Sequence, residues 1–207
     1  MPDHPFDDIE ATMKKSVAAF REANIPALLA GSLAVWARGG PEARHDLDFV
    51  VKPEDAERAL QALEDAGMKP ERPPEGWLLK AWDGDVLVDV IYEPRGLVVD
   101  DELMARAEER EVMAIGIRLM ALEDVLVSKL MSLDEHSADY TQILLMARAL
   151  REQIEWDDLR ARTSASPFAK AFFTLADELG IAPRAGSSAA ASEGSPARAR
   201  VRVIEGG

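Results

Sequence analysis

Residues 29–51 read LAGSLAVWARGGPEARHDLDFVV, and this segment decides the fold. An apolar strand leads into Gly31-Ser32, and after a short helix and a turn a second strand opens with Asp46 and Asp48. Because side chains alternate along a strand, both carboxylates lie on one face. Aspartate is depleted in strands, and like charges on one face repel. The start of this second strand therefore predicts a site for divalent cations.

A third carboxylate, Asp89, lies within the apolar run 86–91, VLVDVI. Burial of an unpaired carboxylate is costly, and ligation of a metal ion removes that cost. The backbone N–H groups of Gly31-Ser32 suit a phosphate. A glycine turn beside paired carboxylates is what metal-assisted phosphoryl or nucleotidyl transfer requires.

Each of these residues also has a purely structural interpretation. Ser32 could be a helix N-cap, which is a common role for serine. Asp46 and Asp48 could be exposed residues at a strand start, and Asp89 could pair with a buried arginine. The occurrence of all three features in this order favours a functional site.

The order Gly-Ser, spacer, Asp-x-Asp and a later strand carboxylate resembles the nucleotidyltransferase superfamily, which shares the polymerase beta palm fold. The resemblance implies that Asp46, Asp48 and Asp89 bind Mg²⁺ or Mn²⁺ at the phosphates of a nucleoside triphosphate. It implies that Gly31 and Ser32 hold the β- and γ-phosphates. Arg38, which follows the Gly-Ser turn, is expected to bind the nucleotide through its positive charge.

The sequence predicts an α+β fold, with an N-terminal mixed β-sheet and flanking helices followed by a C-terminal helical bundle. Residues 1–120 are expected to form the nucleotidyltransferase palm domain, and residues 121–182 the helical domain. The composition of residues 183–207 predicts a disordered tail. The expected strands are 25–30, 46–51, 77–82, 86–92 and 112–120, and the expected helices are 8–23, 33–38, 53–66, 100–109, 121–133, 138–150, 156–163 and 167–179.

Two charged residues fall on apolar stripes of the expected C-terminal helices. Lys129 shares its stripe with Leu122 and Leu126, and Asp139 shares one with Ile143. A lone lysine at such a position can extend to the surface, and Asp139 could cap its helix or pair with Lys129. Two charges of this kind on consecutive, antiparallel helices favour a shared site.

The stretch 122–144, LEDVLVSKLMSLDEHSADYTQIL, resembles the region after the palm in minimal nucleotidyltransferases of the AbiEii/MenT type, some of which are toxins of toxin–antitoxin pairs. Lys129 matches the family's lysine and Asp139 its aspartate, whereas His136 stands where the family often has arginine. The resemblance implies that Lys129 neutralises phosphate charge and that Asp139 orients Lys129 or the acceptor. It also implies an antitoxin protein as a partner.

Composition limits the classes of function. The 207 residues include no cysteine, which is compatible with a reducing cytoplasm, and no apolar run long enough to span a membrane. The N-terminal segment lacks the apolar region of a secretory signal. The net charge of −14 disfavours non-specific binding of nucleic acid but leaves a local basic patch possible.

The predicted activity is metal-dependent transfer of a nucleoside monophosphate from a nucleoside triphosphate to a hydroxyl acceptor. A tRNA 3′ end would suit the toxin-like resemblance, and a cationic small molecule such as an aminoglycoside would suit the acidic chain. A protein hydroxyl is a third acceptor. Alternatives from other classes are a non-catalytic nucleotide-binding module and a hydrolase or kinase that uses the same metal site.

Overall fold

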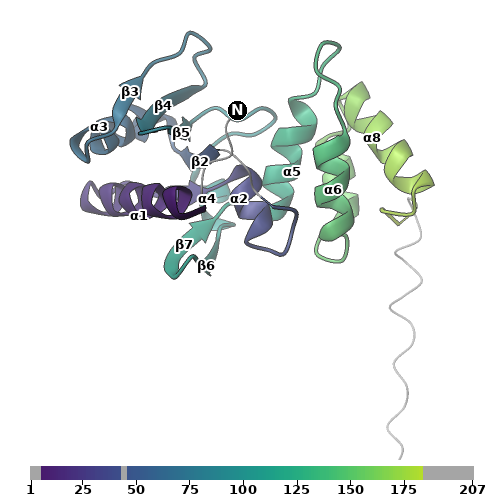
Figure 1. Ribbon diagram of the computed structural model, residues 1–207. Coiled ribbons are helices and arrows are strands. Elements are labelled where there is room, and N and C mark those ends of the chain that lie inside the picture. The colour runs from purple at the N-terminus through teal and green to yellow at the C-terminus, as the bar shows by residue number, and fades with distance from the viewer. Residues whose placement is uncertain (1–5, 43–45, 184–207) are drawn as a thin grey trace, which may run out of the picture.

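The computed structural model describes residues 6–42 and 46–183, which build a seven-stranded sheet in the order β3-β4-β5-β2-β1-β7-β6 (Figure 1). Strand β1 is parallel to β7 and β2 is parallel to β5, while the other neighbours are antiparallel. The predicted α+β class with a mixed sheet is confirmed. The strands are β1 (Ala27–Leu29), β2 (Asp46–Val51), β3 (Lys69–Glu71), β4 (Leu78–Asp83), β5 (Val86–Ile91), β6 (Glu108–Val112) and β7 (Ile115–Leu119).

Along the chain, some helices alternate with the strands and others come after the last strand. Figure 1 shows α5, α6 and α8 side by side at one side of the molecule and α1 at the other. The helices are α1 (Phe6–Glu22), α2 (Gly31–Trp36), the 3₁₀ turn η1 (Pro53–Asp55), α3 (Ala56–Asp65), α4 (Asp101–Ala105), α5 (Leu122–Met131), α6 (Thr141–Ala149), α7 (Trp156–Arg162) and α8 (Pro167–Glu178). The division into domains at residue 120 stays a prediction. The tail predicted to be disordered lies, from residue 184 onward, outside the described residues.

Alternation along β2 separates two apolar clusters. Leu47, Phe49 and Val51 are fully buried on the face covered by α1 and α3, where the Phe49 ring meets that of Phe20 at 5.1 Å in an edge-to-face contact. Val50 points to the opposite face and joins the cluster that includes α5. Asp46 and Asp48 share the Val50 face because their positions differ from it by even numbers. The carboxylates thus lie on the side of the sheet that faces α5.

The region 100–120 differs from the predicted helix and single strand. Helix α4 ends at Ala105, and two antiparallel strands, β6 and β7, follow. The hairpin turn is formed by Met113 and Ala114, whose φ values are 51° and 59°. These residue types seldom adopt positive φ, so the usual glycine or asparagine signal of a hairpin is missing. The prediction of one strand over residues 112–120 was therefore wrong.

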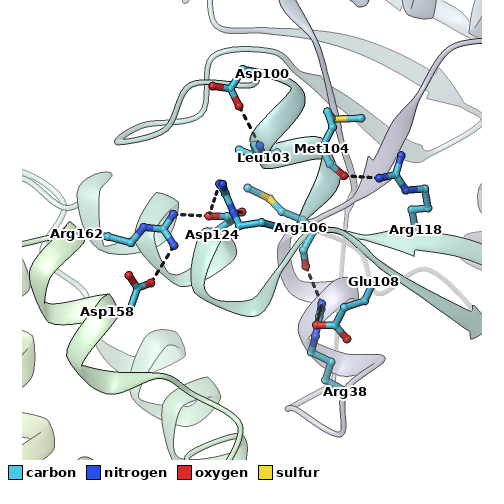
Figure 2. Close-up of polar contacts among 11 residues, drawn as sticks. Arg38, Asp100, Leu103, Met104, Arg106, Glu108, Arg118, Asp124, Asp158 and Arg162 are labelled. Carbon is cyan, nitrogen blue, oxygen red and sulfur yellow. Dashed lines mark hydrogen bonds and ion pairs between the residues drawn. The ribbon is translucent and has the colours of Figure 1, made fainter.

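A buried ion-pair network fixes α5 between its neighbours (Figure 2). Asp124 of α5 has no exposed surface and accepts hydrogen bonds from Arg106 at 3.1 and 3.2 Å. It also pairs with Arg162 of α7, which in turn donates to Asp158 at 3.2 Å. Buried charges require such partners.

Among the helices that the structure describes, none is long and apolar enough to cross a membrane.

Candidate active site

A cleft of about 490 Å³ lies between the start of β2 and helices α5 and α6. It brings together residues that are far apart in the sequence. Its lining is Ser32, Pro41, Glu42, Asp46, Asp48, Lys129, Gln142, Leu145 and Met146. A volume of this size is typical of small-molecule sites. Four of the residues predicted from the sequence therefore share one cleft.

The Gly31 backbone packs directly against the Asp48 carboxylate. The N–H of Ala30 donates to the carbonyl oxygen of Asp48 at 2.8 Å, which joins the start of α2 to β2. A Cβ atom on Gly31 would lie 1.7 Å from Asp48 Oδ2, and Gly31 has a φ of 59°. Both features require glycine. The N-cap of α2 is Ala30, so Ser32 is not the N-cap and its side chain lines the cleft instead.

The three predicted carboxylates lie on one face of neighbouring strands. Asp48 and Asp89 are register partners in the parallel pair β2–β5, and Asp46 lies two residues before Asp48. Across β5, Lys80 of β4 faces Asp89, with its Nζ 3.6 Å from Asp89 Oδ1. That oxygen is buried and makes no hydrogen bond. Within residues 6–42 and 46–183, the structure shows no group of three or more histidine or acidic side chains that could hold a metal ion without moving.

Burial and the negative charges of neighbouring carboxylates make Asp48 and Asp89 hard to ionise. Burial raises the pKa of Asp48 from 3.8 to about 7; the ammonium of Lys129 opposes this shift, and the charges of Asp89 and Asp46 add to it. Burial also raises the pKa of Asp89, against the opposing effect of Lys80. The face therefore carries an excess of negative charge, which a cation would relieve.

Lys129 is the cation of α5 that faces this charge. It is partly buried and lines the cleft, and its charge acts on the Asp48 carboxylate. Within the described part of the chain its ammonium forms no hydrogen bond and no ion pair closer than 4.0 Å. An ammonium without a fixed partner beside a cleft can accept an anionic ligand such as a phosphate.

Asp139 is placed differently from the prediction. Helix α6 begins at Thr141, so Asp139 precedes the helix and occupies no apolar stripe. Its exposed carboxylate accepts a hydrogen bond from the N–H of Thr141 at 2.9 Å, and this bond lowers its pKa. The predicted helical position of Asp139 was wrong. Its side chain lies before the helix and accepts a hydrogen bond from a backbone N–H group at the helix start, as the capping interpretation expects. Its carboxylate does not line the cleft.

Arg38 is also used elsewhere. Its guanidinium is buried and donates to the carbonyl oxygens of Ala34 and Met120 at 2.9 and 2.8 Å. It also donates to Glu108 at 3.1 Å, and Figure 2 shows these two side chains next to each other. It satisfies a carbonyl of α2 and ties the end of that helix to the start of β6 and the end of β7. Arg38 is not among the residues that line the cleft. Its guanidinium is thus engaged in contacts within the fold, and its contact with the nucleotide stays a prediction.

Several residues of the site were not predicted from the sequence. Lys80 faces Asp89 because the β4–β5 hairpin turns through Gly84 and Asp85. A hairpin with this turn between the two predicted strands predicts the pairing. Gln142 and Leu145 line the cleft from α6, and an uncharged helical pair carries no sequence signal of its own.

The sequence matches one family model. Residues 10–180 match a family described as uncharacterised nucleotidyltransferase. No curated protein matches the chain significantly.

Several solved structures have a similar fold. The solution structure of the antibiotic-resistance factor ANT(2″)-Ia has a TM-score of 0.58 and 17% identity, covering 83% of this chain and 96% of its own. The crystal structure of ANT(2″)-Ia in complex with adenylyl-2″-tobramycin has a TM-score of 0.57 at 17% identity, covering 80% and 97%. A putative nucleotidyltransferase from Helicobacter pylori has a TM-score of 0.52 at 18% identity, covering 86% and 83%. At these identities the likeness establishes the fold.

Proposed function

The chain belongs to the family of uncharacterised nucleotidyltransferases, and we propose that its cleft transfers a nucleoside monophosphate from a nucleoside triphosphate to a hydroxyl acceptor. One observation carries the proposal. The cleft is lined by the Asp46 and Asp48 carboxylates, by Ser32 and by the unpaired ammonium of Lys129. Such a site can bind a phosphate chain through Lys129 while the carboxylates stand beside the reacting phosphorus.

The proposed reaction is a direct displacement. The acceptor oxygen forms a bond to the α-phosphorus, the bond from that phosphorus to the bridging oxygen breaks, and pyrophosphate leaves with the electron pair. The hydroxyl proton passes to the Asp89 carboxylate, which lies beside Asp48 on the same face of the sheet. Lys129 stabilises the charge that develops on the phosphate oxygens, while Gly31 and Ser32 hold the phosphate chain.

The carboxylates also fit a divalent cation. Oxygen donors suit Mg²⁺ or Mn²⁺, and the buried Asp89 Oδ1 without a hydrogen bond offers one such donor. The approach of Gly31 holds the Asp48 carboxylate in place. Asp46, Asp48 and Asp89 would hold the ion. When bound, the ion polarises the phosphate oxygens and offsets their charge.

A cationic small molecule is the acceptor that the charges favour. Glu42 stands on the wall of the cleft, and the chain carries a net charge of −14. Such a field attracts a polyamine-like acceptor and repels a polynucleotide. A tRNA 3′ end and an antitoxin partner rest on the AbiEii/MenT resemblance alone and stay predictions.

A labelling experiment tests the proposed function. The protein is incubated with each nucleoside triphosphate labelled at the α-phosphorus, with Mg²⁺, and with separate RNA, protein and small-molecule fractions of a cell extract. We expect transfer of label to one fraction, with the cationic small molecules favoured. Label that stays in free nucleotide with every fraction would contradict the proposal.

Two variants control this experiment. Asp48→Ala should abolish transfer while the circular dichroism spectrum stays native. Lys129→Ala should lower the rate by about 100-fold, the usual effect of losing one charge-stabilising donor. Full transfer by Asp48→Ala would exclude the proposed site even if the protein is active.

A further inference from the structure

The two sides of the cleft differ in chemical character. On the sheet side lie the carboxylates of Asp46 and Asp48, with the ammonium of Lys129 close to them. On the α6 side lie Gln142, Leu145 and Met146, which carry no charge. A nucleoside triphosphate has the same division, with a charged phosphate chain at one end and an uncharged planar base at the other.

Helix α6 presents unused surface to the cleft. Leu145 is 47% exposed, although Ile143 and Met146 on the same helix are buried in the core. Gln142 lies three residues before Leu145, so the two side chains share one helix face. Within the described chain the Gln142 amide makes no hydrogen bond. The face therefore combines an open apolar surface with a free donor and a free acceptor.

We infer that Gln142 and Leu145 form the nucleobase subsite of the cleft, in which Leu145 packs against the face of the base and the Gln142 amide reads its edge. This inference rests on the proposed function. The side-chain amide of glutamine offers one acceptor and one donor, which match the N6 amino group and N7 of adenine. Guanine presents two acceptors at its O6 and N7 edge, so one of them would face the amide oxygen. Among purines, adenine is the preferred base.

Binding measurements on the full chain test this subsite without any acceptor. Calorimetry with Mg²⁺ compares non-hydrolysable α,β-methylene analogues of ATP and GTP with inorganic tripolyphosphate, which lacks a base. We expect the wild type to prefer the ATP analogue, and Gln142→Ala to lower the ATP-to-GTP affinity ratio by about tenfold. Leu145→Ala should weaken both analogues several-fold. Neither variant should change tripolyphosphate binding.

Leu179→Ala is the matched control, because Leu179 is 52% exposed and lies at the end of α8, outside the lining of the cleft. It should change none of the three affinities. Equal binding of the ATP and GTP analogues by the wild type, or variants that leave both unchanged, would overturn the subsite. A wild type that binds neither analogue nor tripolyphosphate would overturn the proposed function as well.

Discussion

At the scale of single residues, the contact between Gly31 and Asp48 links the backbone to the chemistry of the cleft. The turn before α2 comes so close to the carboxylate that no side chain fits at position 31. The same contact limits the freedom of Asp48, which lies on a face with Asp46 and Asp89. A glycine at this position is thus a requirement of the site and not only of the turn.

Gly31→Ala should therefore be more harmful than another substitution at positive φ. We expect a loss of about 1–2 kcal/mol for the backbone conformation and a further loss of about 1–3 kcal/mol for the overlap with Asp48. Gly84→Ala is the control, since Gly84 has a φ of 62° and nothing within 4 Å of an added Cβ. Urea unfolding measures both. Equal losses of unfolding free energy in the two variants would show that the overlap has no cost.

The raised pKa of Asp48 predicts a pH dependence of stability in a chelator. The folded-state pKa of about 7 lies above the ordinary 3.8, so the folded state binds more protons between these values and the unfolding free energy falls as the pH rises. Asp48→Asn removes this loss. The variant should melt above the wild type at pH 8 and approach it near pH 4. A melting-temperature difference that does not change with pH would exclude a raised pKa.

Much of this residue chemistry is visible in the sequence. The alternation of Asp46 and Asp48 with Leu47 and Phe49 predicts the carboxylate face correctly, because strand geometry leaves no other arrangement. The position of Arg38 was not predictable in this way. Its partners include Glu108 and the Met120 carbonyl, which are distant in the sequence and reach it only through the order of strands.

At the scale of secondary-structure elements, the orientation of α5 decides where Lys129 points. The helix packs through Val125, Leu126 and Leu130 and is fixed by the buried Asp124. Arg106 from the segment after α4 and Arg162 from α7 hold this carboxylate from two sides (Figure 2). The network thus positions the proposed phosphate-binding residue without touching the cleft.

Asp124→Ala should destabilise the fold by an amount on the order of 2 kcal/mol, since it removes charge-assisted hydrogen bonds while both arginines can reach water. Asp158→Ala removes only the exposed partner of Arg162 and should cost less than about 0.5 kcal/mol. Thermal or urea unfolding measures the difference. Similar losses of unfolding free energy in both variants would mean that the burial of Asp124 adds no stability.

The boundaries of helices and strands are only partly predictable from the sequence. The long apolar patterns of α1, α3, β2 and β5 were predicted close to their observed positions. The start of α6 was misplaced by three residues because Asp139 is used outside the helix. The β6–β7 hairpin was missed because its turn uses Met113 and Ala114. Both errors come from local side-chain and backbone choices that periodicity does not report.

At the scale of the whole molecule, the sheet and the later helices act together. The cluster that includes Leu28 and Val50 of the sheet also contains side chains of α5, α6, α7 and α8. The cleft lies at the junction between these parts, lined from β2 on one side and from α5 and α6 on the other. Relative movement of the two parts would change the distance between Lys129 and the carboxylates.

A chain that ends at Pro183 should fold like the full chain. The two apolar clusters lie within residues 9–182, and the carbonyl oxygen of Pro183 accepts a hydrogen bond from Arg160 at 3.3 Å. We expect the shortened protein to show the same cooperative melting transition and the same nucleotide binding. Loss of soluble expression or a markedly lower melting temperature would show that residues 184–207 have a structural role.

The fate of the individual phosphorus atoms tests the central claim most directly. Parallel reactions use the preferred nucleoside triphosphate labelled at the α- or the γ-phosphorus, with the acceptor fraction and Mg²⁺, and compare the wild type with Asp48→Asn. Nucleotidyl transfer at this cleft predicts α-label on the acceptor, γ-label in pyrophosphate, and neither with Asp48→Asn. Transfer of γ-label to the acceptor, or its release as inorganic phosphate, would contradict nucleotidyl transfer and indicate a kinase or a hydrolase.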